Sequence, residues 1–160
     1  VNAEYYSAYL YLAMSAQADR AGFKGIANWL FIQAREEMAH GTHLYQHILE
    51  RGAAPSFKEI KAPELSPGGI REIFEKVLAH ERHVSSLIDS IATLAQKEED
   101  HATYNFILWY VNEQIEEEAT AEEILAKIKL TDSHPGLLFS LDAELGSRTF
   151  TDPFGGSAST

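Results

Sequence analysis

The residues in this sequence best suited to chemistry are carboxylates and one histidine, spaced so that they recur on helix faces. Each half of the pattern has one Glu followed, 33 residues later, by a polar pair spaced three apart: Glu4 with Glu37 and His40, and Glu81 with Gln114 and Glu117. Residues three apart share one face of a helix, so each pair can present two ligands to one centre. The repeated interval predicts a pseudo-twofold site with unequal halves.

Each of these residues interrupts an otherwise apolar stripe of a predicted helix. Steps of three and four residues give four buried faces: Val1, Glu4, Ala8, Tyr11, Ser15, Ala18; Ile26, Leu30, Gln33, Glu37, His40, Leu44, His47; Ile70, Phe74, Val77, Glu81, Val84, Ile88, Ile91; and Ile107, Tyr110, Gln114, Glu117, Ala121, Ile124, Ile128. An unpaired buried carboxylate costs on the order of several kcal/mol. Four gathered carboxylates would also repel one another and raise their own pKa values, so the stripes predict bound cations.

Composition limits which metals and partners are possible. The chain has no cysteine, so thiolate catalysis, thiolate metal sites and disulfides are excluded, and any metal must be held by oxygen and imidazole. Such ligands favour iron, manganese or zinc. The net charge of −11 repels nucleic acid and anionic lipid and attracts cations. No apolar run approaches the roughly 18 residues that a membrane helix needs. We therefore expect a cytoplasmic protein with no nucleic-acid or membrane partner.

Residues that start or end helices divide the chain into five predicted helices, at about 1–20, 25–51, 67–96, 101–129 and 135–146. Gly22 and Gly52 end the first two, and Ser66 with Pro67 is typical of an N-cap and first helical position for the third. The loop from 53 to 66 can just span the second helix, which is roughly 40 Å long. The prediction is an all-α four-helix bundle with one long crossover and a short fifth helix, in one domain of 1–160 with a disordered-looking tail at 151–160.

The ligand pattern matches half of a known template. Di-iron bundle proteins supply one Glu from each of two helices and Glu-x-x-His from each of the other two. The second half of this chain has Gln-x-x-Glu instead, so its metal should be held more weakly. The expected ligands are Glu4, Glu37 and His40 for one iron, and Glu81 and Glu117 for the other, with Glu37 bridging and Gln114 either a ligand or a hydrogen-bonded neighbour.

Five ordered segments resemble the non-haem ferritins of bacteria and archaea: N-A-E-Y-Y-S-A-Y-L-Y-L at 2–12, N-W-L at 28–30, R-E-E-M-A-H at 35–40, H-E-R-H-V at 80–84 and Y-N-F-I-L-W-Y-V-N-E-Q-I-E-E-E at 104–118. The likeness covers essentially the whole chain. It implies a ferritin-like bundle that assembles as a hollow homo-oligomeric shell of 24 subunits. It also implies ferroxidase activity, in which oxygen or peroxide oxidises Fe(II) at a di-iron centre and ferric mineral is stored in the cavity.

The resemblance implies roles for further residues. Tyr11 matches a tyrosine beside the centre that supplies an electron during oxidation. Glu36, Glu113 and Glu116 match carboxylates that, with Glu117, form a third iron site toward the cavity. From the residues alone, Tyr11 could simply pack with its hydroxyl satisfied, and the three glutamates belong to charge runs that are usually solvated. The histidines other than His40 are typical of surface or helix-end positions.

Several alternatives remain open at this stage. Met38 stands where bacterioferritin has its haem-binding methionine, but the fourth predicted helix lacks the second Glu-x-x-His of that relative, so haem is not expected. Rubrerythrin would need a cysteine-ligated iron module, which this chain lacks. From other functional classes, a metal-free helical scaffold would use the polar stripe only to fix helix register. A di-metal oxidase would act on an organic substrate and would form a small oligomer.

Overall fold

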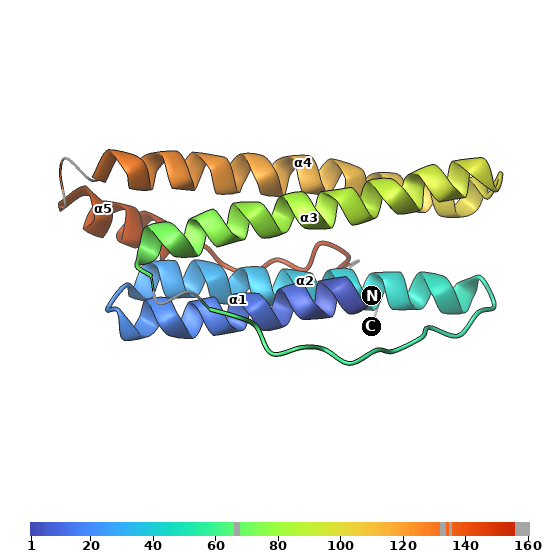
Figure 1. Ribbon diagram of the computed structural model, residues 1–160, viewed down its shortest axis with the longest axis horizontal. Helices are drawn as coiled ribbons and strands as arrows, with labels where there is room; N and C mark the ends of the chain where they lie inside the picture. The colour runs from blue at the N-terminus through green and yellow to red at the C-terminus, as the bar shows by residue number, and fades with distance from the viewer. Residues whose placement is uncertain (66–67, 132–133, 135, 156–160) are drawn as a thin grey trace. The chain divides into compact units, whose positions relative to one another are not determined.

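The computed structural model describes residues 1–65, 68–131, 134 and 136–155. Regular structure in these residues consists of five α-helices: α1 (Asn2–Arg20), α2 (Lys24–Glu50), α3 (Ile70–Lys97), α4 (His101–Leu130) and α5 (Gly136–Leu145) (Figure 1). They belong to two compact units, Val1–Gly69 with His134–Thr160, and Ile70–Ser133. The all-α prediction is confirmed. None of the described helices is long and apolar enough to cross a membrane.

In the first unit, α1 and α2 pack together as a hairpin, and glycines end both helices. At the end of α1, the N–H of Gly22 donates to Asp19 at 3.0 Å and the N–H of Phe23 donates to Ala18 at 3.1 Å, which is a Schellman motif. Gly22 has φ of 92° and Gly52, after α2, has φ of 77°. Glycine adopts this left-handed conformation without strain, so both predicted helix ends are confirmed.

The described residues between α2 and α3, 51–65 and 68–69, belong to a long strap that runs along α1 (Figure 1). Near the start of α1, the Asn2 side chain donates to the Ser56 carbonyl at 2.8 Å and accepts from the Lys58 N–H at 2.9 Å. Near its end, Gln17 Nε2 donates to the Gly68 carbonyl at 3.0 Å. The strap therefore carries the chain back from the end of α2 to the end of the hairpin where α2 begins.

The third helix begins later than the sequence predicted. It starts at Ile70 and not at about 67, because Gly68 and Gly69 lie outside the helix and glycine is a poor helix former. The expected N-cap Ser66 and first helical residue Pro67 lie outside the described residues.

The second unit is the α3–α4 hairpin, whose tight turn is held by side chains. Asp100 caps α4: its Oδ1 accepts from the Thr103 N–H at 3.1 Å, and its Oδ2 accepts from the Thr103 hydroxyl at 2.7 Å. The N–H of Asp100 donates back to Ala95 at 2.9 Å, which closes α3. Glu99 has φ of 56°, a left-handed conformation that glycine fills at the other two helix ends.

The four predicted stripes are buried apart from a few positions at their ends. Val1, Ser15 and His47 are half-buried. The prediction for Ile91 is wrong, since its side chain is 39% exposed. After Ile88 the protected face continues through Ala92, which is half-buried, and Ala95, which is buried, so the helix advances by four residues where the prediction took three.

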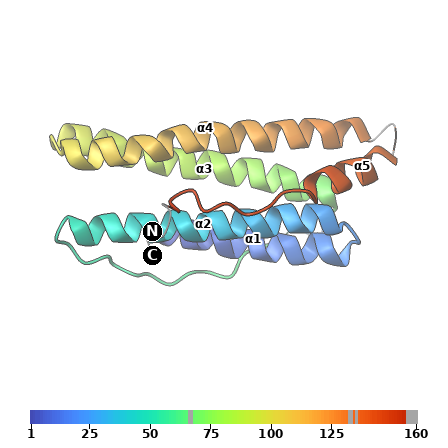
Figure 2. The same ribbon diagram turned by 180° about the vertical axis from the view of Figure 1, so that it is seen from behind.

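The fifth helix docks on the first turn of α2. The N–H of Ile26 donates to Asp142 Oδ1 at 2.8 Å. Gly25 allows this approach, because a Cβ there would lie 1.7 Å from the Asp142 carbonyl oxygen. The chain after α5 then continues along α2 (Figure 2), where the Phe154 and His43 rings stack at 3.7 Å. Phe154, within the tail expected to look disordered, is thus in contact with α2, while 156–160 lie outside the described residues.

Candidate metal centre

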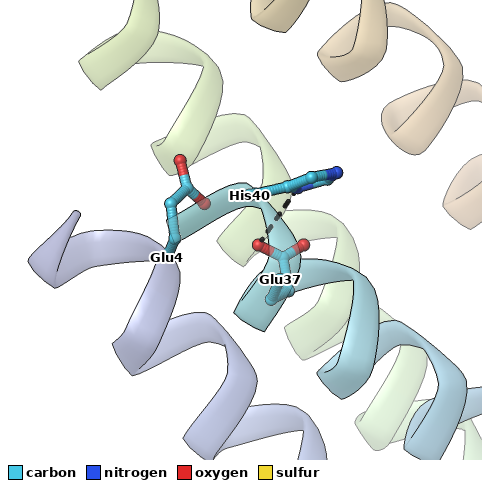
Figure 3. Close-up of side chains that lie close together, drawn as sticks. All are labelled: Glu4, Glu37 and His40. Carbon is cyan, nitrogen blue, oxygen red and sulfur yellow. Dashed lines mark ion pairs between the residues drawn. The ribbon is translucent and has the colours of Figure 1, made fainter. Parts of the chain in front are cut away.

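Glu4 from α1 meets Glu37 and His40 from α2 in the first unit (Figure 3). One ligand atom from each residue lies within 4.8 Å of the other two. All three side chains are buried, with relative exposures of 3%, 2% and 2%. The helical step of three residues places the α2 pair on one face, and the hairpin brings the first turn of α1 against it. The structure therefore brings together the three ligands predicted for one iron.

Burial sets the protonation of this cluster. It raises the pKa of the Glu4 carboxyl, and a hydrogen bond with Glu37 partly opposes the rise. Burial, reinforced by neighbouring His43, lowers the pKa of His40 to about 4. Its Nδ1 lies 3.7 Å from Glu37 Oε2. The imidazole is therefore neutral at pH 7 and can ligate, while a bound cation would displace protons held by the carboxyl pair.

The second unit holds the other predicted ligands. Glu81 on α3 and Gln114 and Glu117 on α4 are buried, with relative exposures of 1%, 7% and 7%. Gln114 Nε2 donates to the Glu81 carbonyl oxygen at 3.2 Å and to its carboxylate Oε2 at 3.2 Å. Each hairpin thus buries one lone Glu from one helix and a polar pair from the next. In the second, Gln114 acts as a hydrogen-bond donor to the lone Glu.

The residues assigned by resemblance have varied surroundings. Tyr11 is fully buried and lies edge-on to Trp29, with ring centroids 6.4 Å apart. Glu36 is half-buried, and its carboxylate is 2.6 Å from the guanidinium of Arg148. Glu113 is half-buried and Glu116 is exposed.

Sequence reasoning missed two residues of the C-terminal segment, one that lies against His40 of the first cluster and one that contacts α2 nearby. Phe154 is edge-on to His40, with centroids 5.9 Å apart, besides its stacking on His43. Arg148 hydrogen-bonds Gln33 and lies 5.1 Å over the Trp29 ring. The available signal was a basic residue and two aromatics in an otherwise polar tail, since Phe150 also packs, 3.9 Å from the Arg35 guanidinium.

Comparison with known proteins identifies the family. Residues 1–131 match the model of the ferritin-like domain. A bacterial non-heme ferritin of Bacteroides fragilis (strain 638R) is 41% identical over 148 residues, which cover 92% of each chain. The chain belongs to the ferritin family. A second bacterial non-heme ferritin, from Staphylococcus aureus (strain MRSA252), is 34% identical over 152 residues, covering 95% of this chain and 92% of that relative.

Solved ferritin structures have the same fold. A closed form of the Archaeoglobus fulgidus ferritin, engineered by site-directed mutagenesis, has a TM-score of 0.91 at 41% identity, covering 94% of this chain and 92% of that one. An open pore ferritin from the same archaeon has a TM-score of 0.90 at 40% identity, covering 92% and 91%. The predicted ferritin-like four-helix bundle with a short fifth helix is confirmed. Family membership supports iron storage and iron binding for this ferritin.

Proposed function

We propose that this ferritin oxidises Fe(II) to Fe(III) at a buried di-iron centre and stores the ferric mineral in a hollow shell of its own copies. The observation that carries the proposal is the buried cluster of Glu4, Glu37 and His40, whose ligand atoms lie within 4.8 Å of one another. Carboxylates and a neutral imidazole are ligands suited to iron. Their burial also makes the cluster unfavourable without a cation.

Iron is the substrate in this proposal. Glu4, Glu37 and His40 bind the first Fe(II), which displaces protons held by the carboxyl pair. The negative charge of the carboxylates stabilises Fe(III) relative to Fe(II) and so favours loss of an electron. Two Fe(II) ions give one electron each, and O₂ takes up two electrons and two protons to leave as hydrogen peroxide.

The second iron is assigned to Glu81 and Glu117, with Glu37 bridging. This ion has no histidine ligand, and weaker binding lets oxidised iron move on toward the store. Tyr11 is on the same face of α1 as Glu4 and is fully buried, which suits a tyrosine that supplies an electron. The proposed third site consists of Glu36, Glu113 and Glu116 together with Glu117.

Storage requires an enclosed volume, so we propose that the copies assemble as a shell. From the resemblance to ferritins we propose 24 copies and a cytoplasmic location. Both archaeal relatives support an assembled shell, since one is described as an open pore ferritin and the other as an engineered closed form. Light scattering on the purified protein measures the assembly. A mass near 24 times 17.8 kDa is expected. A small oligomer would contradict the shell and favour an oxidase that acts on an organic substrate.

Anaerobic addition of Fe(II), followed by oxygen, tests the oxidation step. The wild-type protein should bind two Fe(II) per subunit and form Fe(III) rapidly, and the double variant Glu37→Ala, His40→Ala should oxidise iron at least about tenfold more slowly. His83→Ala, which removes an exposed histidine, is the matched control. Unchanged oxidation in the double variant would overturn the proposal.

A further inference from the structure

Three hydrogen-bond acceptors surround the side-chain nitrogen of Gln114. Besides the two oxygens of Glu81, the hydroxyl of Ser85 lies 3.4 Å from Nε2. An amide nitrogen only donates and an amide oxygen only accepts, so a carbonyl and a carboxylate require the nitrogen on this side. The two oxygens of Glu81 thus favour one of the two orientations that differ by a 180° rotation of the amide.

The Ser85 hydroxyl can support or oppose this orientation, depending on where its proton lies. Its Oγ is 3.0 Å from the Glu81 carbonyl oxygen and is also hydrogen-bonded to Glu118 Oε1. A hydroxyl has one proton, and a hydrogen bond to a carboxylate is roughly twice as strong as one to a neutral carbonyl. The proton therefore goes to Glu118, which leaves the lone pairs of Ser85 to accept from Gln114.

Glu118 is in turn held by a cation on α3. Arg82 Nε lies 3.7 Å from Glu118 Oε2, and Arg82 Nη2 lies 2.6 Å from Glu122 Oε1. The guanidinium orients the Glu118 carboxylate, and a carboxylate can only accept hydrogen bonds. The hydrogen bonds thus run in one direction, from the Gln114 amide to the Ser85 hydroxyl and from that hydroxyl to Glu118.

We propose that Ser85 and Glu118 are positioning residues for the second iron and act through Gln114; the inference rests on the proposed function. They hold Nε2 on Glu81, so that Oε2 of Glu81 accepts a hydrogen bond from the amide. Gln114 can then offer iron only its neutral Oε1. A second iron bound in this way is held loosely, as a site that must release its product requires.

Removing either residue should loosen the orientation of the amide. In Glu118→Gln the Ser85 proton is no longer held by a charge and can turn to Gln114, which allows the amide to rotate and present its N–H groups to the cation. In Ser85→Ala the amide loses an acceptor on the Glu81 side. Ser85→Thr keeps the hydroxyl and should behave as wild type.

Calorimetric titration provides a readout that does not depend on oxidation. The assembled, iron-free protein is titrated with Fe(II) under anaerobic conditions and, separately, with Co(II). Wild type should show two binding steps per subunit. Ser85→Ala and Glu118→Gln should weaken only the second step, by about 3- to 10-fold, the value of one hydrogen bond. Glu122→Gln is the matched control. It also removes a carboxylate that pairs with Arg82, but the Ser85 hydroxyl bonds to Glu118 and not to Glu122.

The outcomes separate this inference from the function on which it rests. Fewer than two binding steps in wild type would overturn the proposed di-iron centre and the inference with it. Two steps in wild type and an unchanged second step in Ser85→Ala would overturn the inference alone. Equal weakening of both binding steps would indicate a general structural effect and would also overturn the inference. Equal effects of Glu118→Gln and Glu122→Gln would indicate a general charge effect, with the same consequence.

Discussion

Arg148 Nη2 lies 2.6 Å from Glu36 Oε2, so a residue of the C-terminal segment neutralises one carboxylate of the proposed third iron site. The pair is partly shielded, with side-chain exposures of 29% and 15%. Arg148 also hydrogen-bonds Gln33 on the same helix. A cation can therefore bind Glu36 in this arrangement only by competing with the guanidinium.

Arg148→Ala should strengthen metal binding at the third site. The ion pair is partly buried and charge-assisted, so its loss should raise the affinity of that site for Fe(II) by about 5-fold, equivalent to about 1 kcal/mol. Anaerobic titration that resolves the weakest binding step measures this change. Arg51→Ala, an exposed arginine after α2, is the control. If the weakest binding step is unchanged in Arg148→Ala, the guanidinium and the metal ion do not compete for Glu36.

The iron-free protein should lose stability as the pH falls from 6.5 toward 4. His40 has its pKa lowered to about 4 from 6.5, so in this window the unfolded chain binds more protons than the folded one. The loss amounts to roughly 3 kcal/mol if the full shift applies. Urea unfolding of metal-stripped protein at several pH values tests it, and His40→Gln should flatten the slope. Equal slopes in both proteins would assign the effect to other groups.

Glu4 should have the opposite pH dependence. Its raised pKa means that the folded chain holds a proton that the unfolded chain releases, so this contribution is present below pH 4.5 and is lost as pH rises through the folded-state pKa. In Glu4→Gln the iron-free protein should therefore be more stable than wild type near pH 7, because no buried carboxyl remains to ionise. Urea unfolding of the metal-stripped pair at pH 7 measures the difference, and a less stable variant would contradict the raised pKa.

Glu99→Gly should stabilise the turn between α3 and α4. Glu99 has φ of 56°, which costs a residue with a Cβ roughly 1 kcal/mol, and glycine removes that cost. We expect a gain of about 0.5–1 kcal/mol in the free energy of unfolding, measured with urea. Glu98→Gly, one residue earlier at negative φ, should give no gain. Equal effects of the two substitutions would rule out backbone strain as the cause.

Gly25→Ala should weaken the docking of α5. The added methyl would lie 1.7 Å from a backbone oxygen that cannot move aside as a side chain can. Overpacking of this kind costs about 1–3 kcal/mol. Limited proteolysis should then cut the segment after residue 134 faster than in wild type. Gly136→Ala, where an added Cβ meets nothing within 4 Å, should leave the cleavage rate unchanged.

Periodicity predicted the helices and the buried polar residues well, because both depend on local geometry. Glu81 could be placed in a buried stripe from its apolar neighbours alone, and the structure leaves it 1% exposed. Gly22 and Gly52 ended their helices as expected, because the left-handed conformation at a helix end favours glycine. The error at Ile91 arose where steps of three and four are equally plausible and only packing decides between them.

Contacts made by irregular segments could not be predicted in this way. Arg148 reaches Glu36 across 112 residues of sequence, through a segment with no apolar period. Phe154 likewise has no neighbour in the sequence that indicates its contact with His40. The bond from Ser85 to Glu118 joins two residues whose types suit any solvated helix face, so only their measured approach reveals the connection to Gln114.

The first compact unit is discontinuous, since α5 and the described residues after it return to the hairpin of α1 and α2. During synthesis on the ribosome the hairpin emerges first, and the segment that packs against His40 and Trp29 emerges only after α3 and α4. Until then the first turn of α2 lacks its docking partner and remains open to chaperones or to another nascent chain. Completion of this unit, and with it any assembly that needs a docked α5, therefore waits until the segment after α4 has been synthesised.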